Sequence, residues 1–142
     1  MQNQSETQQN KLVVARFNKE VIEQGNVSAF NELMAPTFVD RSAPAGVPPG
    51  PEGMLYAFNQ VLRPAFPDLK VTIHEQVAEG DRVTTRKTIT GTHLGPLFGI
   101  SATNRSISIE VIDIVRVVNG QYVEHWGVNT MPSLIVALQQ PG

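Results

Sequence analysis

A change of hydrophobic period after Asp68 is the feature that most limits how this chain can fold. Before Asp68, apolar residues recur at helical spacing, first between Lys11 and Gln24, where Gly25-Asn26 supplies a stop. After it, Val71, Ile73 and Val77 alternate with polar residues, which is the period of a half-buried strand. Helices followed by antiparallel strands predict an α+β cone, a curved sheet whose concave face is covered by helices.

The remaining elements follow from breakers and turns. Two further helices are expected over 27–34, ended by Pro36, and over 52–63, ended by Pro64. The segment 41–53 between them is rich in proline and glycine, so we expect a loop that can cover a pocket as a lid. Further strands are expected over 82–93, 105–118 and 121–129, with a type I′ hairpin turn at Asn119-Gly120 and a closing helix over 131–140.

Length and composition exclude several classes of protein. With 142 residues the chain can bury about two-thirds of its unfolded surface, and we expect a polar flexible tail over 1–10 and one domain over 11–142. A formal net charge of -2 without a run of Lys or Arg argues against nucleic acid. No apolar run approaches the roughly 20 residues that cross a bilayer, and the start does not resemble a secretory signal. A cytoplasmic protein without a membrane partner is therefore expected.

Asp113 is the most informative candidate for chemistry. It occupies the middle of an apolar row in the strand 105–118, formed by Ile107, Ile109, Val111, Val115 and Val117. A buried carboxylate either becomes neutral, with a raised pKa, or meets a partner. Such a group can act as a general acid or base. The alternatives are a structural ion pair with Arg86 or Arg116, or a bend of the strand that turns Asp113 outward.

Two more titratable residues are candidates for catalysis. His93 has the same parity as Val83 and Ile89, so its ring is expected to point inward; a lone inward histidine is also common in protein cores. Asp40 follows the second helix at the mouth of the predicted cone. It can reach inward as a base, cap a turn or pair with Arg41.

The expected pocket has an apolar wall and a sheet side. His125 shares parity with Val123 and Gly127, whereas Tyr122, Glu124 and Trp126 have the opposite parity and can meet a second subunit. A plain hydrophobic core is the alternative for the apolar residues. Three separated histidines give no recognisable metal site, so no metal is expected. The residues expected to contact a small ligand are Phe17, Met54, Phe58, Phe66, Ile109, Val111, His125, Gly127 and Asn129.

Several stretches resemble the SnoaL-like polyketide cyclases, also called ester cyclases, of the nuclear transport factor 2-like superfamily. They follow the family's order over nearly the whole chain after residue 10. The matching stretches are Glu32-Leu33, Phe38-Val39-Asp40-Arg41, Gly50-Pro51-Glu52-Gly53, Ala65-Phe66-Pro67-Asp68-Leu69, Ala78-Glu79-Gly80-Asp81-Arg82-Val83, Gly91-Thr92-His93-Leu94-Gly95, Ile112-Asp113-Ile114-Val115-Arg116 and Glu124-His125-Trp126-Gly127.

The resemblance implies a cone that dimerises through the outer face of its sheet and needs no cofactor. It implies acid/base chemistry on a small apolar carbonyl or polyketide-like ligand, as in the intramolecular aldol cyclisation of a polyketide ester. This chain departs from the pattern, because the family's last-strand aspartate is Gly127 here and its common histidine is Asp113.

His93 matches the family's histidine, and Asp40 falls where those cyclases carry Asn. The position of Asp40 is similar to that of the base of the ketosteroid isomerases, so isomerisation is a variant. A binding or dimeric interaction module without catalysis is the alternative, because Gly127 cannot transfer a proton.

Overall fold

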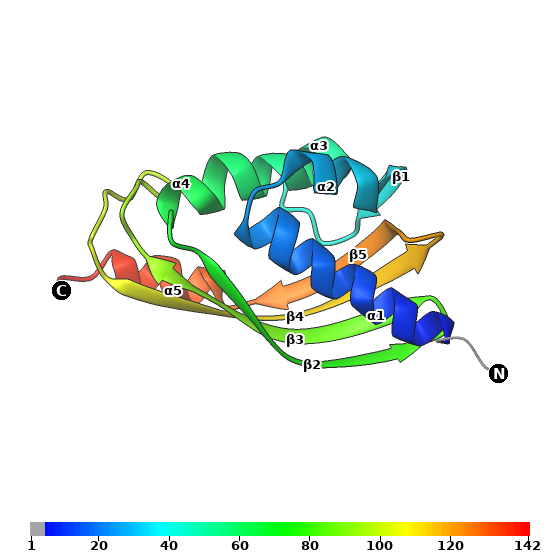
Figure 1. Ribbon diagram of the computed structural model, residues 1–142. Helices are drawn as coiled ribbons and strands as arrows, with labels where there is room; N and C mark the ends of the chain where they lie inside the picture. Colours follow the sequence, from blue (N-terminus) through cyan, green and yellow to red (C-terminus); the bar gives the residue numbers. More distant parts are fainter. Residues whose placement is uncertain (1–4) are drawn as a thin grey trace.

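The computed structural model describes residues 5–142 and has the helices and the sheet in two layers (Figure 1). The first layer contains α1 (Glu6–Arg16), which continues into the π-helical segment η1 (Phe17–Glu23), and α2 (Val27–Leu33). It also contains α3 (Pro51–Tyr56), η2 (Ala57–Leu62) and α4 (Arg63–Ala65), which follow one another without a break. No helix of the described residues is long and apolar enough to span a membrane.

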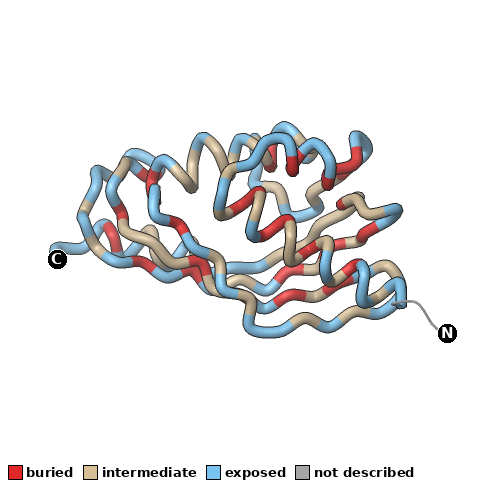
Figure 2. The backbone as a smooth tube through the Cα atoms, in the orientation of Figure 1, coloured by how far each residue is buried: buried red, intermediate tan, exposed pale blue. Residues whose placement is uncertain are grey.

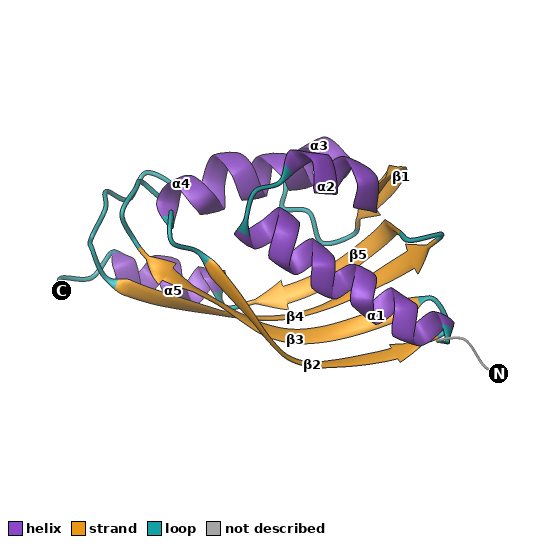
Figure 3. Cartoon of the chain, viewed as in Figure 1, coloured by secondary structure: helices purple, strands orange, loops and turns teal. Residues whose placement is uncertain are grey.

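The second layer is a curved sheet of five strands over the described residues, with the order β1-β5-β4-β3-β2 (Figure 3). The strands are β1 (Met34–Asp40), β2 (Lys70–Glu79), β3 (Arg82–Thr92), β4 (Ser106–Val118) and β5 (Gln121–Asn129). The helix α5 (Met131–Leu138) follows β5 at one end of the sheet. The α+β architecture predicted from the change of period is confirmed.

The hairpin between β4 and β5 has the predicted geometry. Asn119 and Gly120 have φ angles of 52° and 76°, as a type I′ turn requires. β1 was not predicted. It pairs in parallel with β5 at the sheet edge, where the missing N–H of Pro36 is tolerated.

The first helix begins earlier than the sequence predicts. The side chain of Ser5 accepts a hydrogen bond from the N–H of Gln8 at 3.2 Å and caps the helix. Residues 6–10, expected in the polar tail, are therefore helical and Ser5 is their cap, whereas residues 1–4 lie outside the described residues. The third helix also runs past Pro64, which lies in the short α4 that directly follows the π-helical segment η2, and ends at Ala65.

Two register shifts overturn predictions made from strict alternation. A bulge in β2 between Ile73 and Glu75 turns Val77 outward, where it is 63% exposed. A bulge near the start of β5, where Val123 is the extra residue between Tyr122 and Glu124, turns Tyr122 inward, where it is 3% exposed, instead of outward beside Glu124 and Trp126. Each extra residue exchanges the two faces of the strand beyond it.

The core lies between the layers, and buried segments of the helices and the sheet face each other there (Figure 2). Phe17 stacks on Tyr122 with ring centroids 4.0 Å apart, and Phe58 meets Phe17 edge-on at 6.1 Å. These aromatic contacts join the first helix, η2 and β5. They form one wall of the cavity that contains the candidate site.

Candidate active site

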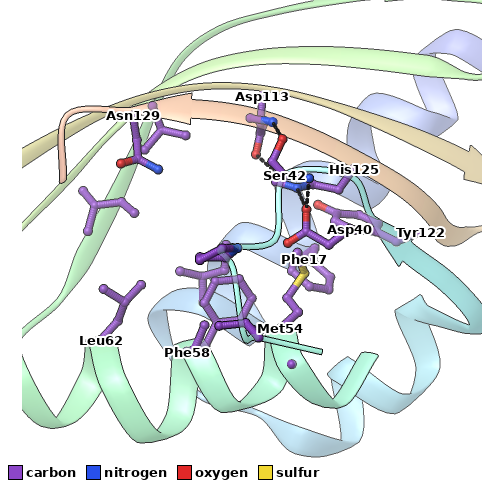
Figure 4. Close-up of a pocket in the computed structure, with 18 of the residues that line it drawn as sticks. Phe17, Asp40, Ser42, Met54, Phe58, Leu62, Asp113, Tyr122, His125 and Asn129 are labelled. Carbon is purple, nitrogen blue, oxygen red and sulfur yellow. Dashed lines mark hydrogen bonds and ion pairs between the residues drawn. The ribbon is translucent and has the colours of Figure 1, made fainter. Parts of the chain in front are cut away.

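A cavity of about 230 Å³ lies between η2 and the concave face of the sheet (Figure 4). Its helix side is apolar, with Met54, Phe58 and Leu62, and its sheet side carries the polar groups. The loop between β1 and α3 adds Ser42, Pro44 and Val47 to the lining. Such an apolar cavity with a few converging polar groups is the usual form of a small-molecule site.

His125 connects two carboxylates at the sheet side. Its Nδ1 lies 2.9 Å from Oδ1 of Asp40, and its Nε2 lies 3.3 Å from Oδ2 of Asp113. The three residues come from β5, β1 and β4, and Asp40 is the direct neighbour of His125 in the parallel β1–β5 pair. The unpredicted strand β1 therefore brings Asp40 to the site.

The charge state of His125 follows from these contacts. Burial by itself lowers the pKa of the imidazole, but hydrogen bonds and charge interactions with Asp113 and Asp40 outweigh it and raise the pKa to about 9. At neutral pH His125 is an imidazolium whose two N–H groups each point to a carboxylate.

Asp113 is buried and ionised. Burial raises the pKa of its carboxyl, but the nearby charges of Lys87 and His125 hold the pKa below its ordinary value. The sequence analysis left open a neutral carboxyl group or a charged one with a partner, and Asp113 has a partner. The partners are not the expected arginines, since Arg86 pairs with Glu75 and Arg116 with Asp81 and Glu124.

One oxygen of Asp113 has no hydrogen-bond partner among the described residues. Its Oδ2 atom faces His125 and Lys87, whereas Oδ1 is buried and has no hydrogen-bond partner within residues 5–142. Asp113 lines the cavity, and Figure 4 shows its carboxylate directed into it. Unpaired buried acceptors are rare in proteins and call for a ligand, water or proton in the functional state.

Lys87 is a member of the site that the sequence reasoning missed. Its side chain is 5% exposed, and its Nζ lies 2.6 Å from Oδ1 of Asn18 and 3.4 Å from Oδ2 of Asp113. The amide of Asn18 is oriented because its nitrogen donates to the carbonyl of Val14 at 2.9 Å. The available signal was the parity of Lys87, which is that of Val83 and Ile89 on β3.

Asp40 reaches inward and also caps a turn. Its carboxylate reaches inward to His125 and also accepts the N–H of Ser42 at 3.0 Å, which caps the turn. Arg41 does not pair with it but with Glu124, at 2.7 Å. The loop is held to the sheet by Ser42, whose Oγ accepts the N–H of Gly127 at 2.9 Å.

His93 lies away from this cluster. It is fully buried beside Phe66, with ring centroids 6.0 Å apart, and its Nδ1 accepts the N–H of Thr103 at 3.2 Å. His93, Phe66 and Ile109 do not line the cavity. The other predicted contact residues do, namely Phe17, Met54, Phe58, Val111, His125, Gly127 and Asn129.

Gly127 has a steric role in the cluster. A Cβ atom at this position would lie 3.1 Å from Cε1 and 3.2 Å from Nε2 of His125. The absence of a side chain therefore lets the imidazole lie across β5 and reach Asp113. Within residues 5–142, no three His, Asp or Glu side chains are grouped as metal ligands.

A helix-covered, curved and unclosed sheet with a pocket at its concave face defines the class of protein, the nuclear transport factor 2-like superfamily. The family model for the SnoaL-like polyketide cyclases matches residues 12–134, and the chain belongs to this family. No curated protein sequence matches the chain.

Solved structures agree with this assignment. TsrD from Streptomyces laurentii is 25% identical with a TM-score of 0.82, and the match covers 96% of this chain and 98% of that one. A protein from Jannaschia sp. CCS1 assigned as a SnoaL-like polyketide cyclase is 26% identical with a TM-score of 0.82, over 100% of both chains. AclR from Streptomyces galilaeus, assigned as a hydroxylase, is 28% identical with a TM-score of 0.82, over 96% of this chain and 85% of that one.

Proposed function

We propose that this protein is an acid/base enzyme that needs no cofactor and removes a proton from the carbon next to a carbonyl group. The observation that carries the proposal is an ionised carboxylate, that of Asp113, in the lining of an apolar cavity, with one oxygen that has no partner among residues 5–142. The carbanion formed there would attack a second carbonyl of the same molecule, which is an aldol cyclisation, or regain a proton at another carbon, which is an isomerisation. Relatives of this fold carry different assignments, so the reaction is defined by the residues of the site and not by the fold.

The charge state of Asp113 limits the substrates that it can deprotonate. The pKa of Asp113 lies below its ordinary value, so its carboxylate is a weak base. A weak base removes a proton efficiently only from a relatively acidic C–H group of the substrate. Carbon between two carbonyl groups is much more acidic than carbon next to one. We therefore propose a β-dicarbonyl compound, such as a β-keto ester, as the substrate class.

The cavity limits the size of the substrate. Its volume of about 230 Å³ is below the roughly 300–1,000 Å³ of typical ligand pockets. The opposite wall of Met54, Phe58 and Leu62 offers no charge or hydrogen bond to a distal polar group. A small, neutral and largely apolar carbonyl compound fits these limits.

The direct test is hydrogen exchange at the acidic carbon. Ethyl acetoacetate would be incubated in D₂O with the native protein, and the loss of its α-proton signal would be followed by NMR. The rate of this loss would be compared with the rate in the absence of protein. Asp113→Asn should lower the protein-dependent rate by roughly 10²- to 10⁴-fold. Glu110→Gln, an exposed change on the same strand, is the matched control and should retain the rate. Exchange that survives Asp113→Asn would exclude Asp113 as the base.

A second candidate function is binding without turnover. It is favoured by Gly127, which stands where the resemblance implies the cyclases' aspartate and cannot transfer a proton. In that case a β-keto ester would bind to the native protein, shown by shifts of the His125 ring signals in NMR, and would be recovered without deuterium. Protein-dependent exchange would exclude this alternative.

We also propose a homodimer formed through the outer face of the sheet. Ile112 and Val128 are 47% and 69% exposed there, directly paired across β4 and β5. The next pair along is Ile114 and Trp126, and the guanidinium of Arg82 lies 5.4 Å from the indole centroid. Contiguous exposed apolar side chains of this kind commonly mark an interface.

A further inference from the structure

Lys87 has a hydrogen-bond donor that the protein itself does not use. An ammonium group has three N–H donors. One N–H points to Asn18, with Nζ 2.6 Å from its Oδ1, and another points to Asp113, with Nζ 3.4 Å from its Oδ2. Within the described part of the chain the third has no partner, and Lys87 lines the cavity. His125, the other cation of the site, has both N–H groups directed at carboxylates.

The position of Lys87 fits a role beside Asp113. The two residues come from the neighbouring strands β3 and β4, in which Lys87 pairs with Val111 and Thr85 pairs with Asp113. Lys87 and Asp113 are thus diagonal neighbours on the concave face, close enough for long side chains to meet. A carbonyl oxygen and the hydrogen on the adjacent carbon are close in any substrate, so one molecule can contact both groups.

We propose that Lys87 binds the carbonyl oxygen of the substrate and stabilises the negative charge that forms on it. The inference rests on the proposed function. The carboxylate of Asp113 takes the α-proton, the electron pair of the broken C–H bond forms the C=C bond of the enolate, and the carbonyl π pair moves to oxygen. Lys87 keeps its protons throughout, because it acts by charge and hydrogen bonding.

The balance of charge in the site supports this role. Before the transfer, the Lys87 ammonium faces the Asp113 carboxylate. Protonation of Asp113 would leave a buried cation without its counter-charge, which is strongly unfavourable. The enolate oxygen supplies a replacement at the same moment. When the proton is transferred, the negative charge beside Lys87 therefore passes from the Asp113 carboxylate to the enolate oxygen.

Three other donors at the cavity are neutral and therefore weaker candidates, namely the side chains of Ser42, Tyr122 and Asn129. Burial and the charge of Asp113 raise the pKa of Tyr122 well above its ordinary value, so its hydroxyl is neutral. Asn129 is on an exposed part of β5, and its Oδ1 accepts the N–H of Met131 at 2.9 Å. Hydrogen bonds from neutral donors are weaker than those from an ammonium group.

The test uses a mimic of the enolate that needs no catalysis. 4-Nitrophenol carries an oxygen anion on a small apolar ring, and its ionised form is seen by absorbance; nitrobenzene has the ring without the hydroxyl. Both would be titrated into native protein, Lys87→Met and the hydrogen-bonding variant Lys87→Gln. Lys70→Met, an exposed lysine at the start of β2, is the matched control. Tyr122→Phe tests the competing donor.

Native protein should prefer the phenolate to nitrobenzene, and each Lys87 variant should weaken phenolate binding by roughly 10- to 100-fold. Nitrobenzene affinity should change little, and Lys70→Met should bind both ligands like the native protein. A native protein that does not prefer the phenolate would overturn the proposal. So would Lys87 variants that keep the preference, variants that lose both ligands equally, or a loss confined to Tyr122→Phe. Absence of α-proton exchange with the phenolate preference intact would instead count against the proposed function alone.

Discussion

Asp113 lies directly opposite Gly127 in the β4–β5 ladder, and a Cβ atom at position 127 would be 3.3 Å from Cβ of Asp113. The same atom would crowd the ring of His125 at 3.1 Å. A carboxylate on β4 therefore reaches the region that a side chain on β5 would otherwise occupy. A side chain at position 127 would therefore crowd both Asp113 and His125.

Gly127→Ala should push the imidazole of His125 away from Asp113. Because that contact helps to raise the pKa of His125 to about 9, the pKa should fall toward 6.5. The measurement is an NMR titration of the ring protons. Val128→Ala, on the opposite face of the same strand, is the control and should leave the pKa in place. An unchanged pKa in Gly127→Ala would mean that the ring has room for a methyl group.

Stability should decline on the alkaline side because of His125. Its pKa is about 9 in the folded protein and 6.5 in the unfolded reference. The contribution to the free energy of unfolding is therefore complete below about pH 6.5 and lost as the pH rises through about 9, up to about 3 kcal/mol. Urea unfolding at a series of pH values measures it. The decline should persist in His74→Gln and disappear in His125→Gln; equal declines in both variants would refute the assignment to His125.

Acid should weaken the fold through Asp113. Its pKa lies below the reference value of 3.8, so its contribution is present above about pH 3.8 and disappears as the pH falls through the folded pKa. Asp113→Asn should remove this component of the acid transition, whereas Glu110→Gln should retain it. Far-UV circular dichroism during acid titration is the measurement. Superimposable acid transitions for native protein and Asp113→Asn would contradict the prediction.

The ion pair between Lys87 and Asp113 should show strong coupling. Lys87→Met leaves a buried carboxylate without this cation and should destabilise the protein by about 3 to 5 kcal/mol. Lys87→Met combined with Asp113→Val should be more stable than Lys87→Met alone, since valine suits an inward position of β4. Urea unfolding of the native, single and double variants provides the cycle. Simple addition of the two single effects would show that the groups do not interact.

Charge on the outer sheet face should disrupt the proposed dimer. Ile112→Lys and Val128→Lys each place an ammonium within the exposed apolar pair, so sedimentation should show a monomer where the native protein is a dimer. Leu12→Lys is the control, because Leu12 is an exposed apolar residue of α1 on the other layer. A native protein that sediments as a monomer would remove the dimer proposal.

Much of the fold could be predicted from the sequence because the signals are local. The period of apolar residues distinguishes helix from strand, and Asn119-Gly120 specifies its own turn. Asp113 stood out because an acid interrupted an apolar row. Lys87 carried the same signal on β3, in a row with Val83 and Ile89, and parity would have identified it.

Tertiary structure decided which of these residues meet. Parity alone placed His93 and Asp113 on the same inward side, but it does not give the distance along the sheet, and His93 packs against Phe66 instead. The parallel pairing of β1 brought Asp40 to His125, and a register shift turned Tyr122 into the cavity. The sequence determined that Lys87 and Asp113 point inward, because the period of two is unbroken along the β3–β4 pair. Only the packing of strands distant in sequence determined that Asp40, His125, Asp113 and Lys87 form one charged cluster, because bulges and long-range pairing depend on the whole fold.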